Sequence, residues 1–184
     1  GHGDTRLDSH LAAPVINASR EVLMERELAP FRAAARAGAA AVMTCHAYYP
    51  ALDPANVATH SAPILRDLLR GELGFSGLVV TDALDMSGVG DMPGLERARR
   101  AVEAGADLAM LGHLPDQGDL VARLSSYVDP VSEARVMEVR RRLPAGLPPL
   151  SVLGADEHLE VARVSSEAAI TAVRGDPVLR DLQR

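Results

Sequence analysis

The chain has 184 residues, a formal net charge of −6 at pH 7, one cysteine and an apolar content of 47%. A single cysteine excludes a disulfide framework, no apolar run is long enough to cross a bilayer, and this apolar content excludes a disordered chain. All 19 basic residues are arginine, which removes P-loop and Schiff-base lysines, and the acidic balance argues against nucleic-acid binding.

A helix, a glycine and an apolar run recur three times within the first 111 residues. The predicted helices are 28–37, 64–73 and 95–104, the glycines are Gly38, Gly74 and Gly105, and the apolar runs are 41–44, 78–81 and 108–111. A glycine just after a helix ends it. Strands that are apolar on both faces and alternate with helices predict a parallel sheet covered by helices, which is an α/β fold.

After residue 111 the pattern changes to helices without intervening strands. Residues 117–127 and 131–143 predict two successive helices, followed by a stretch rich in proline and glycine. A further helix is predicted over 156–168 and a strand over 169–173. The sequence thus predicts a domain over 1–143, a linker over 144–155 and a separate region over 156–184.

Polar side chains follow each of the three predicted strands. Ligands of α/β folds bind beyond the carboxyl ends of the strands. Asp82 follows its strand directly, which favours a functional carboxylate over a structural cap for the next turn. His46 and His113 occupy similar places, where packing explains them as well as substrate contact does. We expect His60, near a helix start, at the surface.

The first ten residues, GHGDTRLDSH, are dense in titratable groups and predict an exposed polar loop. Three interpretations are open. His2, Asp4, Asp8 and His10 could together ligate a metal ion. Asp8 could instead orient and charge His10 for proton transfer. The third interpretation is a polar turn without chemistry.

Several segments resemble family 3 glycoside hydrolases, in the β-N-acetylhexosaminidase branch. The resemblance lies in GHGDTRLDSH with the following LAAPVI, ELAPFRAA, VMTCHAYYPALDP, SAPILRDLLRGELGFSGLVVTDALDM and AVEAGADLAML. It covers about 110 residues in family order, and the DSH and TDALDM segments are specific to that branch.

The resemblance implies a (β/α)8 barrel of which this chain holds the last three units, followed by the start of an α/β sandwich. It implies Asp82 as the nucleophile of a retaining hydrolysis of terminal N-acetyl-β-D-glucosamine. His10 would be the acid/base, and Asp8 would orient it. No metal or other cofactor is implied.

The resemblance also sets expectations about the surroundings. The expected partner is an N-acetylglucosamine-containing saccharide, as in chitin or in recycled bacterial peptidoglycan, and the substrate-binding residues are expected upstream of residue 1. Bacterial cytoplasm and a secreted or lipid-anchored location stay open. The alternatives are a β-glucosidase of the same family, a metal-dependent hydrolase that uses the four-residue cluster, and a fragment without activity.

Overall fold

The protein is described by a computed structural model that covers residues 2–170. It divides into two compact units, Gly1–Leu143 and Pro144–Arg184, and each is described by itself. The first unit contains, in chain order, α1 (Arg20–Val22), η1 (Leu23–Glu27), α2 (Ala29–Arg36), β1 (Ala41–Met43), β2 (Tyr48–Tyr49), β3 (Asp53–Val57), η2 (Ala58–His60), η3 (Pro63–Glu72), β4 (Leu78–Val80), η4 (Ser87–Val89), α3 (Gly94–Ala104), α4 (Gln117–Leu124), η5 (Ser125–Tyr127) and α5 (Pro130–Arg141). In the second unit, η6 (Leu150–Val152) precedes α6 (Asp156–Ala169).

The six predicted helices are confirmed, with ends that shift by a few residues. The helix predicted over 64–73 is η3, which winds with wide π-type turns, as the bond from the amide of Leu73 to the carbonyl of Leu68 shows. Ser61 begins it, because its hydroxyl accepts the amide of Ile64 at 3.2 Å. Of the strand predicted over 169–173, Ala169 instead ends α6, and residues 171–173 lie outside the described part.

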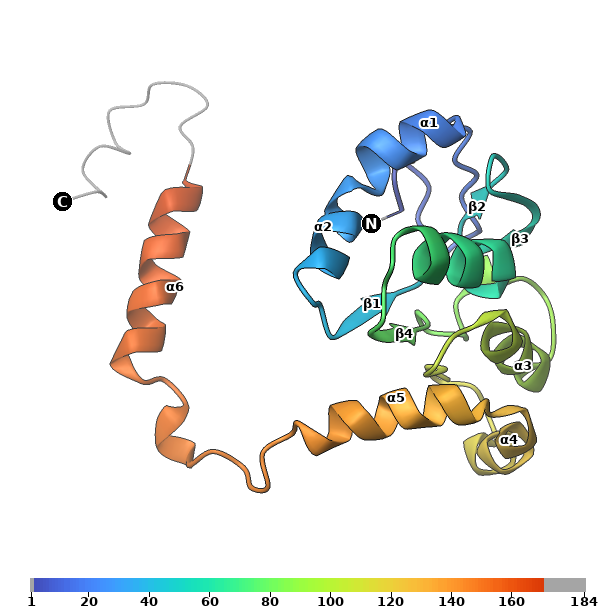
Figure 1. Cartoon of the computed structure of the whole chain (residues 1–184). Helices are drawn as coiled ribbons and strands as arrows, with labels where there is room; N and C mark the ends of the chain where they lie inside the picture. The colour runs from blue at the N-terminus through green and yellow to red at the C-terminus, as the bar shows by residue number, and fades with distance from the viewer. Residues whose placement is uncertain (1, 171–184) are drawn as a thin grey trace. The chain divides into compact units, whose positions relative to one another are not determined.

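The predicted parallel sheet is confirmed for its first two strands. β1 and β4 run side by side in parallel (Figure 1), with Val42 opposite Val79. The third predicted strand, 108–111, is wrong in extent, because only Leu108 pairs, with Val80. The ladder ends there since the amide of Met110 bonds to the Thr81 side chain instead of to a backbone carbonyl.

The predicted cover of helices over the sheet is found at β4 and is incomplete at β1. Val79 is fully buried, whereas Met43 of β1 is 52% exposed. In the described part of the chain, β1 pairs along one edge only.

Two elements of the structure were not predicted from the sequence. The helical segment made of α1 and η1 begins at Ser19, whose hydroxyl lies 3.4 Å from the amide of Val22. The antiparallel hairpin of β2 and β3 is too short and irregular for an alternating pattern. Asp53 stabilises its second strand by accepting the amides of Ala55 and Asn56.

The main core lies where η3, β4 and α3 meet. Leu65 and Leu68 of η3 pack with Val79 of β4 and with Ala101 and Ala104 of α3. Two smaller clusters lie at the N-terminal helical segment and between α3 and the loop after β4.

A buried ionic hub fastens α5 and η3 to the sheet. The Asp107 carboxylate, with no exposed side-chain surface, lies 2.5 Å from the guanidinium of Arg70 and 3.0 Å from that of Arg135. It also accepts the hydroxyl of Ser132 at 2.7 Å and the amide of Val79 at 2.8 Å. One carboxylate thus satisfies donors from three elements.

We expect Asp107→Asn to lower the free energy of unfolding by about 3–5 kcal/mol, since two partly buried arginines then lose their counter-charge. Denaturant unfolding measures this. Asp119→Asn is the matched control, because the ion pair of Asp119 with Arg123 is exposed on α4 and contributes little. Equal stability of the two variants would contradict the role of the hub.

None of the helices in the described residues combines the length and apolar character needed to span a membrane.

Candidate functional site

Asp82 lies just beyond the carboxyl end of β4. Thr81, which precedes it, is fully buried and accepts the amide of Met110 at 2.8 Å. The Asp82 side chain is half-buried, and its Oδ1 accepts the amide of Ala83 at 2.7 Å. The carboxylate therefore has a rigid base and a partly open face, as a nucleophile needs.

The backbone that follows Asp82 is fixed at three points. The Nε2 of His46 lies 2.9 Å from the carbonyl oxygen of Ala83. The amide of Leu84 donates to the carbonyl of Met110 at 2.9 Å, and the guanidinium of Arg97 on α3 donates to the Leu84 carbonyl at 2.7 Å. Side chains and backbone from three parts of the chain thus hold this turn.

Asp8 and His10 form an exposed carboxylate–imidazole pair. Oδ1 of Asp8 accepts both the Nδ1–H of His10 at 2.8 Å and its backbone amide at 2.9 Å. The hydrogen bond to Asp8 raises the pKa of His10, and the bonds from His10 lower the pKa of Asp8. With Nδ1 engaged, Nε2 is the ring atom available to give or take a proton.

Ser9, the residue between Asp8 and His10, holds their loop in place. Ser9 is 2% exposed, although Asp8 and His10 point into solvent. Its carbonyl accepts the amide of Gly88 at 3.1 Å, in the turn η4 that follows Asp82. A Cβ on Gly88 would lie 2.8 Å from that carbonyl oxygen. The loop of the pair is therefore seated directly on the loop that follows Asp82.

The structure brings Asp82 and the pair to the same region. The negative charges of Asp82 and of Asp85 both contribute to the raised pKa of His10. A carboxylate that can attack a carbon atom and an imidazolium that can protonate a leaving group therefore lie within electrostatic reach of each other. This is the composition that an acid/base-assisted displacement requires.

The four-residue metal cluster does not assemble. Asp4 pairs with Arg26 at 3.3 Å, and Oδ1 of Asp8 is engaged by Nδ1 of His10. Within residues 2–170, no group of three or more histidine, cysteine or acidic side chains is placed to hold a metal ion. The geometry therefore favours the proton-transfer interpretation of Asp8 and His10.

Asp85 and His113 form a second carboxylate–imidazole pair, which was not predicted from the sequence. Oδ2 of Asp85 accepts the amide of His113 at 2.8 Å and lies 3.0 Å from its Nδ1. This bonding repeats that of Asp8 with His10, yet 28 residues separate the partners, and no local spacing reveals it. Asp85 thereby holds the loop after residue 111 beside the turn after Asp82.

The expectation that His60 lies at the surface is wrong. His60 is 9% exposed and its Nε2 donates to the carbonyl of Arg97 at 3.0 Å. Burial lowers its pKa to about 4, which keeps the ring neutral. The surface position was predicted because His60 is near a helix start. That local signal does not reveal α3, which comes from a distant part of the sequence and packs over His60.

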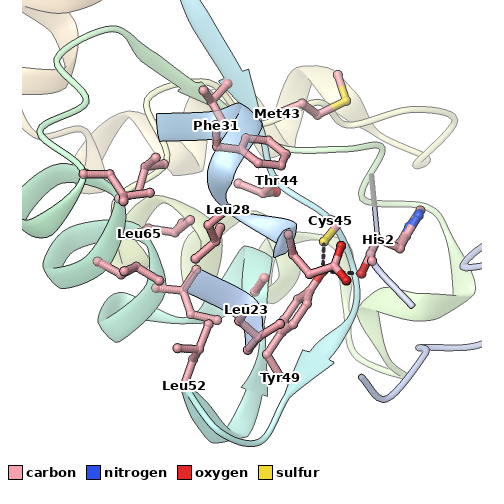
Figure 2. A pocket seen from close by; sticks show the side chains of 18 of the residues that line it. His2, Leu23, Leu28, Phe31, Met43, Thr44, Cys45, Tyr49, Leu52 and Leu65 are labelled. Atoms are coloured by element: carbon pink, nitrogen blue, oxygen red, sulfur yellow. Dashed lines mark hydrogen bonds between the residues drawn. The ribbon is translucent and has the colours of Figure 1, made fainter. Parts of the chain in front are cut away.

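A pocket of about 340 Å³ opens between β1 and the helices η1, α2 and η3 (Figure 2). Leu23, Leu28, Phe31 and Leu65 give it a mostly apolar wall, and Asp82 borders it. Its apolar lining suits hydrocarbon better than sugar hydroxyls, so we do not assign the sugar to it.

Comparisons with known proteins bear on this arrangement. The profile described as "Glycosyl hydrolase family 3 N terminal domain" matches residues 1–145. The chain is 31% identical to Beta-hexosaminidase A of Pseudoalteromonas piscicida, over 97% of its own length and 36% of that protein. The Beta-hexosaminidase of Aromatoleum aromaticum is 38% identical over 80% of the chain and 42% of the relative.

Solved structures give the same picture. A family 3 β-N-acetylglucosaminidase from Paenibacillus sp. str. FPU-7 is similar with a TM-score of 0.81 and 39% identity, over 96% of this chain and 37% of that one. NagZ from Neisseria gonorrhoeae, solved with N-trifluoroacetyl-D-glucosamine, has a TM-score of 0.66 and 30% identity, over 89% and 46% of the two chains. This chain spans less than half the length of each relative named here.

Proposed function

The chain belongs to glycosyl hydrolase family 3, whose N-terminal domain is an α/β fold of the TIM-barrel type, and we propose that it supplies the catalytic residues for hydrolysis of terminal, non-reducing N-acetyl-β-D-glucosamine with retention. The observation that carries the proposal is that Asp82 lies at a strand's carboxyl end and that the loop of His10, which Asp8 orients, is bonded to the turn following Asp82 through Ser9 and Gly88. The names of the relatives support the sugar.

The proposed reaction has two steps. In the first, a carboxylate oxygen of Asp82 attacks the anomeric carbon, the glycosidic C–O bond breaks, and His10 gives its Nε2 proton to the leaving oxygen. In the second, His10 takes a proton from water, the water oxygen attacks the same carbon, and the ester bond to Asp82 breaks. Two inversions give net retention.

One imidazole can serve both steps because imidazoles as a class give up and take back a proton in the neutral pH range. Asp8 stabilises the imidazolium and fixes Nδ1 as the donor toward itself. Asp8 therefore does for His10 what a triad aspartate does for its histidine.

We also infer the place of this segment in the enzyme. The runs 41–44, 78–81 and 108–111 would be the last three barrel strands, 144–155 the linker, and 156–184 the start of an α/β sandwich. The parallel pairing of β1 with β4 and the bridge from Val80 to Leu108 support the first part. The end of the family match at residue 145 supports the second.

The test is hydrolysis of an aryl N-acetyl-β-glucosaminide and of the matching aryl β-glucoside by the protein expressed from its complete reading frame. We expect the N-acetylated substrate to be preferred and NMR to show the β-anomer as the first product. Preference for the glucoside would favour the β-glucosidase alternative, and an α-anomer as first product would exclude retention.

The contact between Gly88 and Ser9 gives a further prediction. Gly88→Ala places a methyl group 2.8 Å from the Ser9 carbonyl oxygen and 3.0 Å from Cβ of His46, so the turn at Gly88 must shift relative to the loop of Asp8 and His10. We expect kcat/KM to fall by up to about 100-fold, as small displacements of catalytic groups do. Steady-state kinetics measure this.

Gly118→Ala is the matched control, because a Cβ there meets nothing within 4 Å. It lies on α4, where alanine is the better helix former. Unchanged kinetics in both variants would show that the seat on Gly88 does not position the pair.

A further inference from the structure

His46 is a fully buried histidine in the loop after β1, and the two steps above do not use it. Its side chain spans two parts of the site. Nε2 lies 2.9 Å from the carbonyl oxygen of Ala83, and Nδ1 lies 2.8 Å from the hydroxyl of Thr59. Both ring nitrogens are therefore engaged away from solvent.

The partners determine which nitrogen carries the proton. A carbonyl oxygen only accepts, so Nε2 must be the donor to Ala83. Burial lowers the pKa of His46 and keeps the ring neutral, which leaves Nδ1 as an acceptor. The Thr59 hydroxyl must then donate to Nδ1, and the hydroxyl of Thr44, 2.8 Å from that of Thr59, donates in turn. The Thr59 hydroxyl also donates to the carbonyl of Cys45 at 3.0 Å, so its proton is shared between that oxygen and Nδ1 of His46.

Ala83 is the residue next to Asp82, and its two polar backbone groups serve different partners. Its amide donates to the Asp82 carboxylate, and its carbonyl accepts from His46. Loss of the His46 donor leaves the Ala83 carbonyl with the amide of Met86, at 3.2 Å, from within the same turn. The turn is then no longer tied to the loop after β1 at this point, and the Asp82 carboxylate, which accepts the Ala83 amide, can move with it.

We propose that His46 is a positioning residue for the nucleophile: its Nε2–H holds the Ala83 carbonyl, Thr59 holds the ring in the tautomer that makes this possible, and together they fix the Asp82 carboxylate. The inference rests on the proposed function, because it takes Asp82 as the nucleophile. It assigns the hydrogen-bonded chain from Thr44 through Thr59 to His46 an indirect part in the reaction, through the Ala83 carbonyl.

Two isosteric variants separate the donor from the acceptor. His46→Gln places an amide N–H near the position of Nε2, and His46→Asn places a carbonyl oxygen near that of Nδ1. Both are measured in the protein from its complete reading frame, with an aryl N-acetyl-β-glucosaminide. We expect kcat to fall by up to about 100-fold in His46→Asn, with KM little changed, and His46→Gln to keep most of the wild-type kcat.

The control is Phe75, a buried core residue before the amino end of β4, at the opposite end of that strand from Asp82. Phe75→Leu is expected to lower the unfolding temperature, as His46→Asn does, but to leave kcat unchanged. A fall in kcat of the same size in both variants would overturn the proposal, because it would reflect lost stability alone.

A spectroscopic arm works even where a variant does not fold. Ring ¹⁵N shifts of His46 in the wild-type protein are expected to report the Nε2–H tautomer, and a protonated Nδ1 would overturn the proposal. Thr59→Ser should retain kcat and Thr59→Val should lower it. Absence of wild-type hydrolysis would overturn the proposed function and this inference with it, whereas wild-type activity with equal kcat in His46→Gln and His46→Asn would overturn this inference alone.

Discussion

Asp82→Ala is expected to reduce kcat/KM for an aryl N-acetyl-β-glucosaminide by roughly 10⁴-fold or more, in line with the loss of other enzymic nucleophiles. Without the carboxylate no glycosyl ester forms, and His10 alone cannot bring water to the anomeric carbon from the correct face. Steady-state kinetics give the loss, and mass spectrometry of the wild-type protein with a slow fluorinated substrate gives the mass of the ester on Asp82.

Azide, added as an external nucleophile, tests the same assignment through the anomeric configuration of the product. In Asp82→Ala a small anion can enter the space of the carboxylate and attack the anomeric carbon in a single displacement, so the expected product is the α-glycosyl azide. Asp119→Ala, which removes an exposed carboxylate on α4, should behave as wild type. Full activity of Asp82→Ala, or a β-azide product, is incompatible with Asp82 as the nucleophile.

The second large effect concerns Asp8 and His10. His10→Ala is expected to lower kcat/KM by about 10²- to 10⁴-fold for alkyl glycosides, whose leaving oxygen needs a proton. The loss should be much smaller for aryl glycosides with acidic leaving groups. A loss that does not depend on the leaving group would contradict the role of His10 as the acid.

Asp8→Asn tests the pair through pH. Asp8 raises the pKa of His10, and the first step needs the protonated ring, so kcat/KM falls as pH rises through that pKa. Without the carboxylate the pKa drops toward its ordinary value, and the fall should move to lower pH. Asp4→Asn, an exposed carboxylate of the same segment paired with Arg26, should leave the profile in place. An unmoved alkaline limb in Asp8→Asn would exclude the coupling.

The repeating helix, glycine and strand could be predicted from the sequence because each unit is a local pattern. Gly105, with a φ of +120°, ends α3 where an L side chain would be strained. The exposure of β1 could not be predicted. The apolar residues of a strand show that it can be buried. They do not show whether other segments cover it, and Met43 remains half exposed.

The candidate residues could be named because short motifs carry them, but their supports could not. Nothing near His46 in the sequence indicates that its ring reaches the Ala83 carbonyl, 37 residues away. His60 was placed wrongly for the same reason, since its partner Arg97 is also 37 residues distant. Asp107, whose carboxylate accepts from Arg70, Val79, Ser132 and Arg135, looks in the sequence like an ordinary residue after a helix.

The seat of Ser9 on Gly88 bears on how this loop could be exchanged between enzymes. Transferring residues 8–10 alone into another barrel would bring the imidazole without the hydrogen bond from Gly88 that holds its loop. The recipient's own turn would then set the distance between the imidazole and the nucleophile. A successful graft must therefore move residues 8–10 together with residues 87–89, because the loop of the acid/base and the turn η4 after the nucleophile form one structural unit.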